Sequence, residues 1–387
     1  MNTNAIVMVA VKTAIVRAKR FKGKKGDSII MANRIFDLPE TRGTFQVAGI
    51  INGTERDKFY TNKKTKTGKD FRAVNFGCAY DDKKSVYVSL NGMPQQKVYF
   101  SKRDQASGKT ETQAVDWANR HKFKADGWRM IGVNLGLTKT TDSNGKVVND
   151  KKVMASFDAC EFISGNLKDD MSTFIRGNLE FSSFMDGEGN IRRNIKYVPS
   201  QISLCKDIDY SAYNDIDNKP VHDFTQTIIF TGIEKEVDND RDTGRFALSA
   251  KIVTYSDIVD TQFIIVDNKL AGLFKKNLKP YTAIEVHGRI EVTHSIQETS
   301  EEDCWGESNA MNSVSAPTKT EMIITGAKPS SIDRESYTEK NVADAVKKIR
   351  ASQTAEQNFS GKAVVNTDTS GWGDDYEDDD EDPWDVE

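Results

Sequence analysis

The segment from residue 224 to 328 carries the pattern that most restricts what this chain can fold into. Residues 245–255, RFALSAKIVTY, place Phe246, Leu248, Ala250 and Ile252 on one side and polar residues on the other. A period of two with one polar face is typical of a half-buried strand. Further strand patterns occupy 225–237, 260–267, 283–292 and 321–329, and a helical pattern ending at Pro280 occupies 268–280.

The order of these segments is strand, strand, strand, helix, strand, strand. This is the order of the OB-fold, a five-stranded Greek-key barrel that binds oligonucleotides on the face of its second and third strands. We therefore predict an OB-like barrel here.

A second run of short strand patterns begins near residue 41. Segments rich in Val, Ile, Phe and Tyr, separated by Gly, Asn and Lys clusters, predict another small, partly open barrel. We expect its strands at 44–53, 71–80, 84–90, 96–102, 128–137 and 152–163, with a helix at 112–123.

The fold class expected for the chain is mainly β, with two OB-fold-like five-stranded barrels, a few short helices and a disordered acidic C-terminal tail. The expected divisions are a basic arm (1–40), a first OB-like domain (41–167), a connecting β-hairpin (168–215), a second OB-like domain (216–330), a short helix (331–350), and a disordered linker with the tail (351–387).

The charge is unevenly distributed. The chain has 54 basic and 58 acidic residues, but ten of the acids lie within 374–387, so residues 1–373 carry a net charge of +6. Six basic residues without an acid also occur in the arm at 17–25. A basic body with an acidic end favours a nucleic-acid partner.

The strongest basic segment within a predicted domain is residues 55–72, which joins the first two strands of the first barrel. In an OB-fold this connection lies beside the binding cleft. Cations that contact phosphates, mixed with rings on which bases stack, suit sequence-independent binding of single strands. The candidate residues are Arg56, Lys58, Phe59, Tyr60, Lys63, Lys64, Lys66, Lys69, Phe71 and Arg72.

Other candidates lie on predicted strands beyond this segment. On the first barrel they are Tyr87, Lys97, Tyr99, Lys102 and Arg103, and on the second barrel Arg245, Lys251, Tyr255 and Arg289. The connection at 297–320 carries five acids and one lysine, which favours weaker DNA binding, or protein contact, by the second barrel.

Lys124–Arg129, KADGWR, resembles the lysine motif of polynucleotide ligases, in which the lysine would attack a nucleotide phosphate. Asp186–Glu188 resembles a later ligase motif but fits a turn between two strands, and the Glu-Gly motif and the paired lysines of the final motif are missing. We therefore interpret the segment as a glycine turn that leads into a strand. The four cysteines and four histidines match no metal-ligand spacing, and we expect no cofactor, no metal and no enzymatic activity. No signal-peptide or membrane-spanning pattern is present, and a cytoplasmic protein is expected.

The last 17 residues, GWGDDYEDDDEDPWDVE, combine acids with aromatic residues. With the basic body and the polar linker, this layout resembles the single-stranded DNA-binding proteins of bacteria and their phages, and the length favours the phage type. The resemblance implies that the tail recruits replication and recombination proteins and competes with DNA for the basic cleft. The matching residues are Asp378, Asp379, Asp380, Glu381, Asp382, Pro383 and Trp384, although three residues follow the tryptophan here. Tyr376 is a further candidate of the tail for binding a partner protein.

We therefore expect a protein that coats single-stranded DNA during replication, recombination or repair. The alternatives are a ligase-like nucleotidyltransferase that uses Lys124, and a DNA-mimicking adaptor whose tail binds other proteins.

Overall fold

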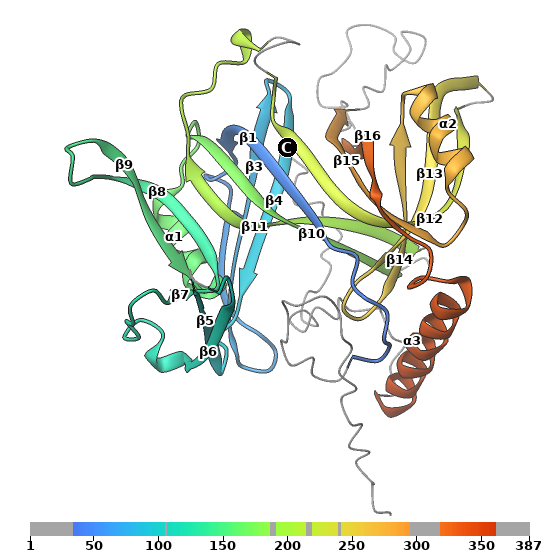
Figure 1. Ribbon diagram of the computed structural model, residues 1–387. Coiled ribbons are helices and arrows are strands. Elements are labelled where there is room, and N and C mark those ends of the chain that lie inside the picture. The colour runs from blue at the N-terminus through green and yellow to red at the C-terminus, as the bar shows by residue number, and fades with distance from the viewer. Residues whose placement is uncertain are drawn as a thin grey trace, which may run out of the picture.

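A computed structural model describes residues 34–104, 107–185, 191–213, 219–238, 241–294 and 318–360. The fold is mainly β, as predicted, with three α-helices in these ranges (Figure 1). Most of the N-terminal arm, most of the acidic connection 297–320 and the whole C-terminal tail lie outside the described residues. No helix among the described residues is both long enough and apolar enough to cross a membrane.

The first barrel consists of five strands in an OB-fold order. The ladders run β1–β3–β4–β11–β10 and return to β1, with only the β4–β11 pairing parallel. Helix α1 lies in the chain between β4 and β10, where an OB-fold has its helix. The strands are β1 (Gly43–Asn52), β3 (Asp70–Asp81), β4 (Lys84–Gly92), β10 (Ser172–Met185) and β11 (Ile191–Leu204), and the helix is Ser156–Asn166.

The second barrel has the same strand order. Its ladders run β12–β13–β14–β16–β15 and return to β12, with only the β14–β16 pairing parallel. The elements are β12 (His222–Asp238), β13 (Arg241–Val253), β14 (Ile258–Ile265), α2 (Asn268–Asn277), β15 (Thr282–His294) and β16 (Thr318–Asp333). The predicted order of this segment is confirmed, as is the inward face of 245–255, where Leu248, Ala250 and Ile252 are buried.

An insertion between β4 and α1 accounts for most errors in the predicted first barrel. It contains β5 (Lys97–Arg103), β6 (Thr110–Asp116), the 3-10 helix η1 (Trp117–Asn119), β7 (Arg129–Met130), β8 (Val133–Thr141) and β9 (Val147–Met154). Strands β5, β6 and β7 form a separate three-stranded sheet, whereas β8 pairs with β9 and along β11. The predicted strand 96–102 therefore exists but does not belong to the barrel.

Two predicted elements of this region are wrong. The expected helix at 112–123 is β6 followed by η1, because Val115 packs on the small core of the inserted sheet and the backbone of Asp116 is extended. The expected strand at 152–163 is the end of β9 followed by α1. There Phe157, Cys160 and Ile163 are buried at helical spacing.

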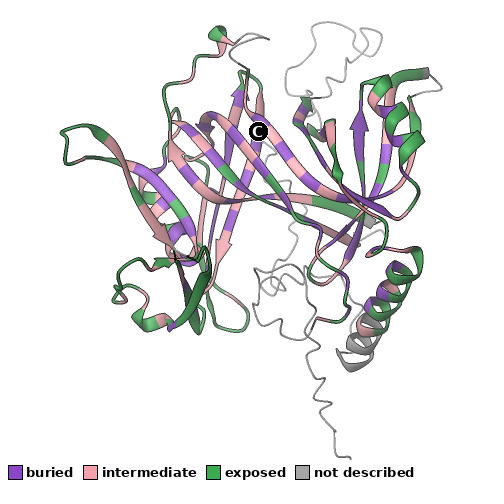
Figure 2. Ribbon diagram, viewed as in Figure 1, coloured by how far each residue is buried: buried purple, intermediate pink, exposed green. Residues whose placement is uncertain are grey.

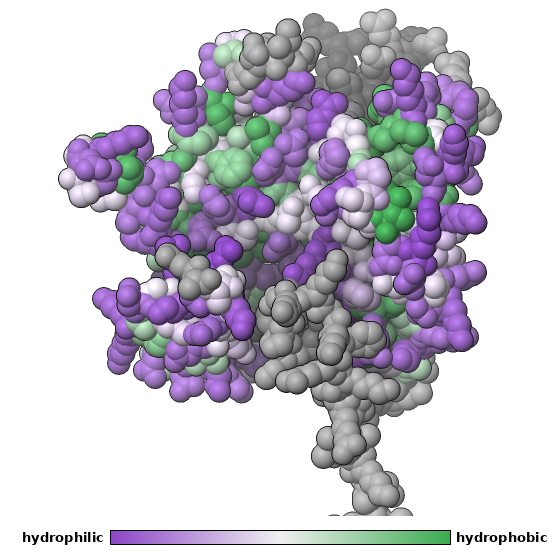
Figure 3. All heavy atoms as spheres, viewed as in Figure 1, coloured by the Kyte–Doolittle hydropathy of each residue, from purple (hydrophilic) through white to green (hydrophobic). Residues whose placement is uncertain are grey.

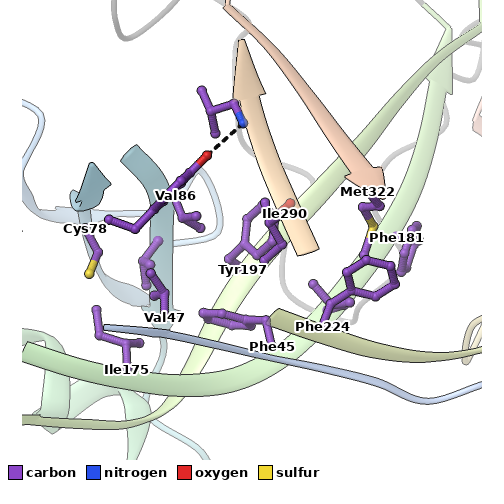
Figure 4. Packing of buried hydrophobic residues seen from close by; sticks show 14 of the residues in the cluster. Phe45, Val47, Cys78, Val86, Ile175, Phe181, Tyr197, Phe224, Ile290 and Met322 are labelled. Carbon is purple, nitrogen blue, oxygen red and sulfur yellow. Dashed lines mark hydrogen bonds between the residues drawn. The ribbon is translucent and has the colours of Figure 1, made fainter. Parts of the chain in front are cut away.

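The hairpin that was expected to connect the domains is part of the first barrel. Strand β10 pairs with β1 along Thr44–Ile50, and β11 contacts β4, so residues 172–204 supply the fourth and fifth barrel strands. The barrels are instead joined by β1, which pairs with β12 through Gly43–Val47. One apolar cluster runs through both barrels, from Phe45 and Tyr197 to Phe224 and Met322 (Figure 4).

Two further contacts hold the barrels together. The rings of Tyr80 on β3 and His222 on β12 are stacked with centroids 4.2 Å apart, and the backbone N–H of Val292 donates to the Tyr80 hydroxyl over 3.0 Å. Helix α3 (Glu339–Ser360) begins and ends later than the expected 331–350 helix. Its residues Val342 and Ile349 pack in a small separate core beside the second barrel. Buried residues fill both barrels, whereas the inserted sheet is largely exposed (Figure 2).

Candidate nucleic-acid interface

The basic hairpin, residues 55–72, projects from the first barrel between β1 and β3. Strand β2 (Tyr60–Lys64) pairs with the start of β3, from Tyr60 opposite Val74 to Lys64 opposite Asp70. The turn is closed by hydrogen bonds between Thr65 and Lys69 and by Gly68, whose φ of +77° suits glycine. The exposed cations are Arg56, Lys58, Lys63, Lys64, Lys66 and Lys69. The hairpin therefore presents positive charge at the connection that was predicted to border a binding cleft.

The aromatic residues of this hairpin do not form the predicted stacking surface. Phe59 and Phe71 are 7% and 3% exposed, and the Phe59 ring packs edge-on against Phe76 in the barrel core at 6.5 Å. Bases cannot stack on rings that are already covered, so the predicted role of these two residues is wrong. Tyr60 is half-buried against the same core, and this burial raises the pKa of its hydroxyl.

Arg72 is also held inside the structure. It shares the face of β3 that carries the inward Val74, at the end of the barrel that α1 covers. Its guanidinium lies 2.8 Å from the Glu161 carboxylate and 4.1 Å from the centroid of the Phe157 ring. The side chain therefore fixes α1 to the barrel and is not a free phosphate contact. Lys64 is exposed, but its Nζ lies 2.7 Å from Asp70.

The remaining first-barrel candidates divide between two surfaces. Tyr87 on β4 lies opposite Gly77 and is half-exposed on the outer side of the barrel wall. Tyr99, with half of its surface exposed, and the exposed Lys97 and Arg103 share the outer face of β5. Lys102 belongs to the opposite face of β5, beside Gly127, and does not join them.

On the second barrel, two of the predicted cations are paired with acids. The Arg245 guanidinium lies 2.6 Å from Glu321 and 3.1 Å from Glu236, and Lys251 Nζ lies 2.5 Å from Asp260. Tyr255 is 46% exposed and Arg289 is exposed. This face therefore carries less net positive charge than the basic hairpin.

Glu321 is the most strongly held acid of this face. Burial raises its pKa, but hydrogen bonds and charges from Lys319 and Arg245 outweigh the burial, and the net pKa is lowered from its ordinary value. The carboxylate therefore stays ionised and keeps Arg245 neutralised near neutral pH.

One basic segment was missed at the sequence level. Arg192 and Arg193 are exposed at the start of β11, beside the connection between the fourth and fifth strands of the first barrel. Lys196 follows and, with Arg42 and Tyr255, lines a cavity of about 420 Å³ between the barrels. The signal was present in IRRNIK, residues 191–196, which has three cations and no acid. A connecting hairpin, as predicted for 168–215, would not border a binding face, whereas the fourth and fifth strands of a barrel do.

The competing motifs are placed as follows. Lys124 is exposed, and the KADGWR segment is the predicted turn, with Trp128 N donating to Ala125 O over 3.1 Å and Gly127 at φ +75°. The described ranges contain no cluster of three potential metal-ligating side chains.

Cys78 and Cys160 are buried, and burial raises the pKa of both thiols to about 12. The tail candidates from Tyr376 to Trp384 lie outside the described residues.

Comparison with known proteins gives one family and several structural likenesses, two of which are described here. No curated protein matches the chain. A deletion mutant of the single-stranded DNA binding protein from Thermus aquaticus has 9% identity and a TM-score of 0.35, with coverage of 75% of this chain and 94% of that one. The wild-type form of that protein gives 10% identity and a TM-score of 0.34, with coverage of 75% and 93%. Likenesses at these scores do not indicate what this chain binds. The model of the YorF family matches residues 102–362, which is more than half of the sequence, and the chain therefore belongs to the YorF family.

Proposed function

We propose that this protein binds single-stranded DNA without sequence preference and coats it during replication, recombination or repair, as a non-enzymatic protein of a phage-infected cytoplasm. The observation that carries the proposal is the basic hairpin between the first two strands of a closed barrel with OB-fold strand order. The same strand order in the second barrel supports it.

The binding mechanism is mainly electrostatic. Lysines of the hairpin would lie along the phosphates and release condensed counterions when the strand binds. The half-exposed Tyr87, on the outer wall of the same barrel, would offer a ring for a base. The basic Arg192 and Arg193 border the other end of the wall, between the fourth and fifth strands. The second barrel would contribute less to the affinity for DNA, because Arg245 and Lys251 are already paired with acids.

The acidic tail would compete with DNA for the basic surface. A run of carboxylates is attracted to the same cations and is displaced when a strand brings more negative charge. The aromatic residues Tyr376 and Trp384 would then be available to replication and recombination proteins. An indole ring does not increase solubility, so a tail that only solubilises the protein would not need Trp384.

The test is a fluorescence-anisotropy titration of labelled oligo-dT at low salt, with the full chain and with a chain that ends at residue 370. We expect binding by both forms, tighter binding by the shorter one, and a preference for oligo-dT over a duplex of equal length. Failure of both forms to bind oligo-dT would contradict the proposal and would favour the DNA-mimicking adaptor.

A further inference from the structure

The inserted sheet, formed by β5, β6 and β7, is an addition to the five strands and one helix of the first barrel. Its inner face has a small core of Val98, Phe100 and Val115, against which Trp117 and Trp128 pack. Burial of these side chains stabilises the sheet. The side chains of the outer face do not contribute to this core, so they are available to bind a partner.

The outer face carries two large exposed apolar side chains next to each other. Tyr99 is 50% exposed and Ile131 is 53% exposed, and the backbone N–H of Ile131 donates to the Tyr99 carbonyl over 2.8 Å. This hydrogen bond places the two residues opposite one another across β5 and the end of β7. The exposed ring and the exposed aliphatic side chain together form an apolar platform on this face. The face of the molecule drawn in Figure 3 is hydrophilic over much of its extent.

Cations surround this platform. On the outer face of β5, Lys97 and Arg103 stand two residues before and four residues after Tyr99, and Arg129 on β7 lies opposite Ser101. The ladder places Arg103 opposite Thr110, and of these cations only Lys97 faces an acid, Asp116. A ring flanked by an excess of positive charge is complementary to an unpaired nucleotide, which has an apolar base and an anionic phosphate.

The inserted sheet is also attached beside the basic hairpin. The Phe157 ring at the start of α1 contacts both Arg72, at the base of the hairpin, and Trp117, which follows β6, with centroid distances of 4.1 and 6.2 Å. Arg120 adds a two-pronged ion pair to Asp158 on the same helical turn, at 2.7 and 2.9 Å. In Figure 1 the hairpin and the inserted sheet lie at the same end of the first barrel.

We propose that the outer face of the inserted sheet is a second contact surface for the single strand, on which an unpaired base stacks on Tyr99 while Arg103 and Arg129 hold the neighbouring phosphates. This inference rests on the proposed function. It extends the binding path of the first barrel from the basic hairpin onto the insertion, so it affects long oligonucleotides more than short ones.

The test compares oligo-dT of about 8 and about 30 nucleotides with Tyr99→Ala and with the double variant Arg103→Ala/Arg129→Ala. Because a stacked base contributes about 1–3 kcal/mol, Tyr99→Ala should weaken binding of the long oligonucleotide about 5- to 150-fold and leave the short one nearly unchanged. The matched control is Lys139→Ala/Lys146→Ala, which removes two exposed cations from the β8–β9 hairpin. It should bind both lengths as the wild type does.

A second measurement uses the wild-type chain alone. Irradiation of a complex with 5-iodouracil-substituted oligonucleotide should give a crosslinked peptide that contains Tyr99. If the wild type binds oligo-dT, but Tyr99→Ala binds the long form equally well and no crosslink forms at this peptide, the inference is overturned and the proposed function stands. If the wild type binds no oligonucleotide, both are overturned.

Discussion

Replacing Lys63, Lys66 and Lys69 of the basic hairpin together by alanine should weaken binding of single-stranded DNA strongly without unfolding the protein. All three side chains are exposed, and the turn is closed by backbone and Thr65 hydrogen bonds that the substitutions leave intact. Each lysine that neutralises a phosphate of a single strand contributes about 0.7 to the slope of log K against log salt. Loss of three should lower that slope by about 2 and the affinity at 0.1 M salt by about 100-fold. Lys64 is left in place because Asp70 already partly neutralises it.

The assay is a titration of labelled oligo-dT by anisotropy at several salt concentrations from about 0.05 to about 0.3 M, a range over which a slope difference of about 2 changes the ratio of the two affinities about 40-fold. The matched control replaces Lys340, Lys347 and Lys348 on α3, three exposed lysines on a helix that packs beside the second barrel. Both variants change the net charge by the same amount, so a general charge effect would lower both affinities equally. An unchanged salt slope in the hairpin variant, or an equal loss in the control, would refute the assignment of the hairpin as the phosphate contact.

Three further predictions address the tail, the second barrel and the junction. Deleting residues 371–387 should tighten oligo-dT binding at low salt and have little effect at high salt, because charges that compete with DNA are screened there; the anisotropy titration detects this, and equal affinities at low salt would contradict it. Glu321→Gln should lower the free energy of unfolding by about 1–3 kcal/mol near neutral pH through the lost charged hydrogen bond to Arg245. Because the pKa of Glu321 is lower in the folded state, that difference should be complete above its ordinary value of 4.5 and should vanish as the pH falls through the folded value; chemical denaturation at several pH values measures it, and a difference that grows in acid would be inconsistent. His222→Ala should lower the free energy of unfolding by about 2–4 kcal/mol, because it removes a buried ring and its hydrogen bond to the Ile290 carbonyl. Tyr80→Phe should lower it by about 1–3 kcal/mol, because the backbone N–H of Val292 loses its acceptor. Thermal or urea unfolding measures both, and an unchanged stability of His222→Ala would exclude a stabilising role of the stacked rings.

The second barrel could be predicted from the sequence because no other helix or strand of the described residues comes between its five strands and its helix. Alternation marks the strands at 245–255 and 283–292, and a change to helical spacing marks the helix, which ends at Asn277, three residues before Pro280. The predicted order of strands and helix therefore agrees with the order in the structure. The first barrel was predicted with the wrong members, because residues 93–155 interrupt it with five strands of their own. Alternation identifies a strand but does not say which sheet it joins, since pairing partners are set by contacts between distant segments.

The candidate site also has features that the sequence could predict and features that it could not. Exposure of the hairpin lysines could be predicted, because long cations are rarely buried without a partner. The burial of Phe59 and Phe71 could not, because an aromatic residue in a basic segment fits a core contact and a base contact equally well. Only the register of β2 on β3, and the packing of Phe59 on Phe76, separates these two roles. Arg72 was misassigned for a similar reason, since its partners on α1 are 85 to 89 residues away in the sequence.

The use of β1 by both barrels determines how the two proposed binding faces could act together. One edge of β1 pairs with β10, while the other edge is divided, with Gly43–Val47 on β12 and Ile50–Asn52 on β3. Rotation of one barrel against the other would break the ladder to β12, separate the rings of Tyr80 and His222 and open the common core. The tandem is therefore one rigid unit and not two modules on a flexible tether, for which linker length would set an effective concentration. A single strand bound by the hairpin of the first barrel, as proposed, would consequently meet the second barrel at a fixed distance and in a fixed direction. With Arg245 and Lys251 already paired to acids, that second contact would add orientation more than affinity.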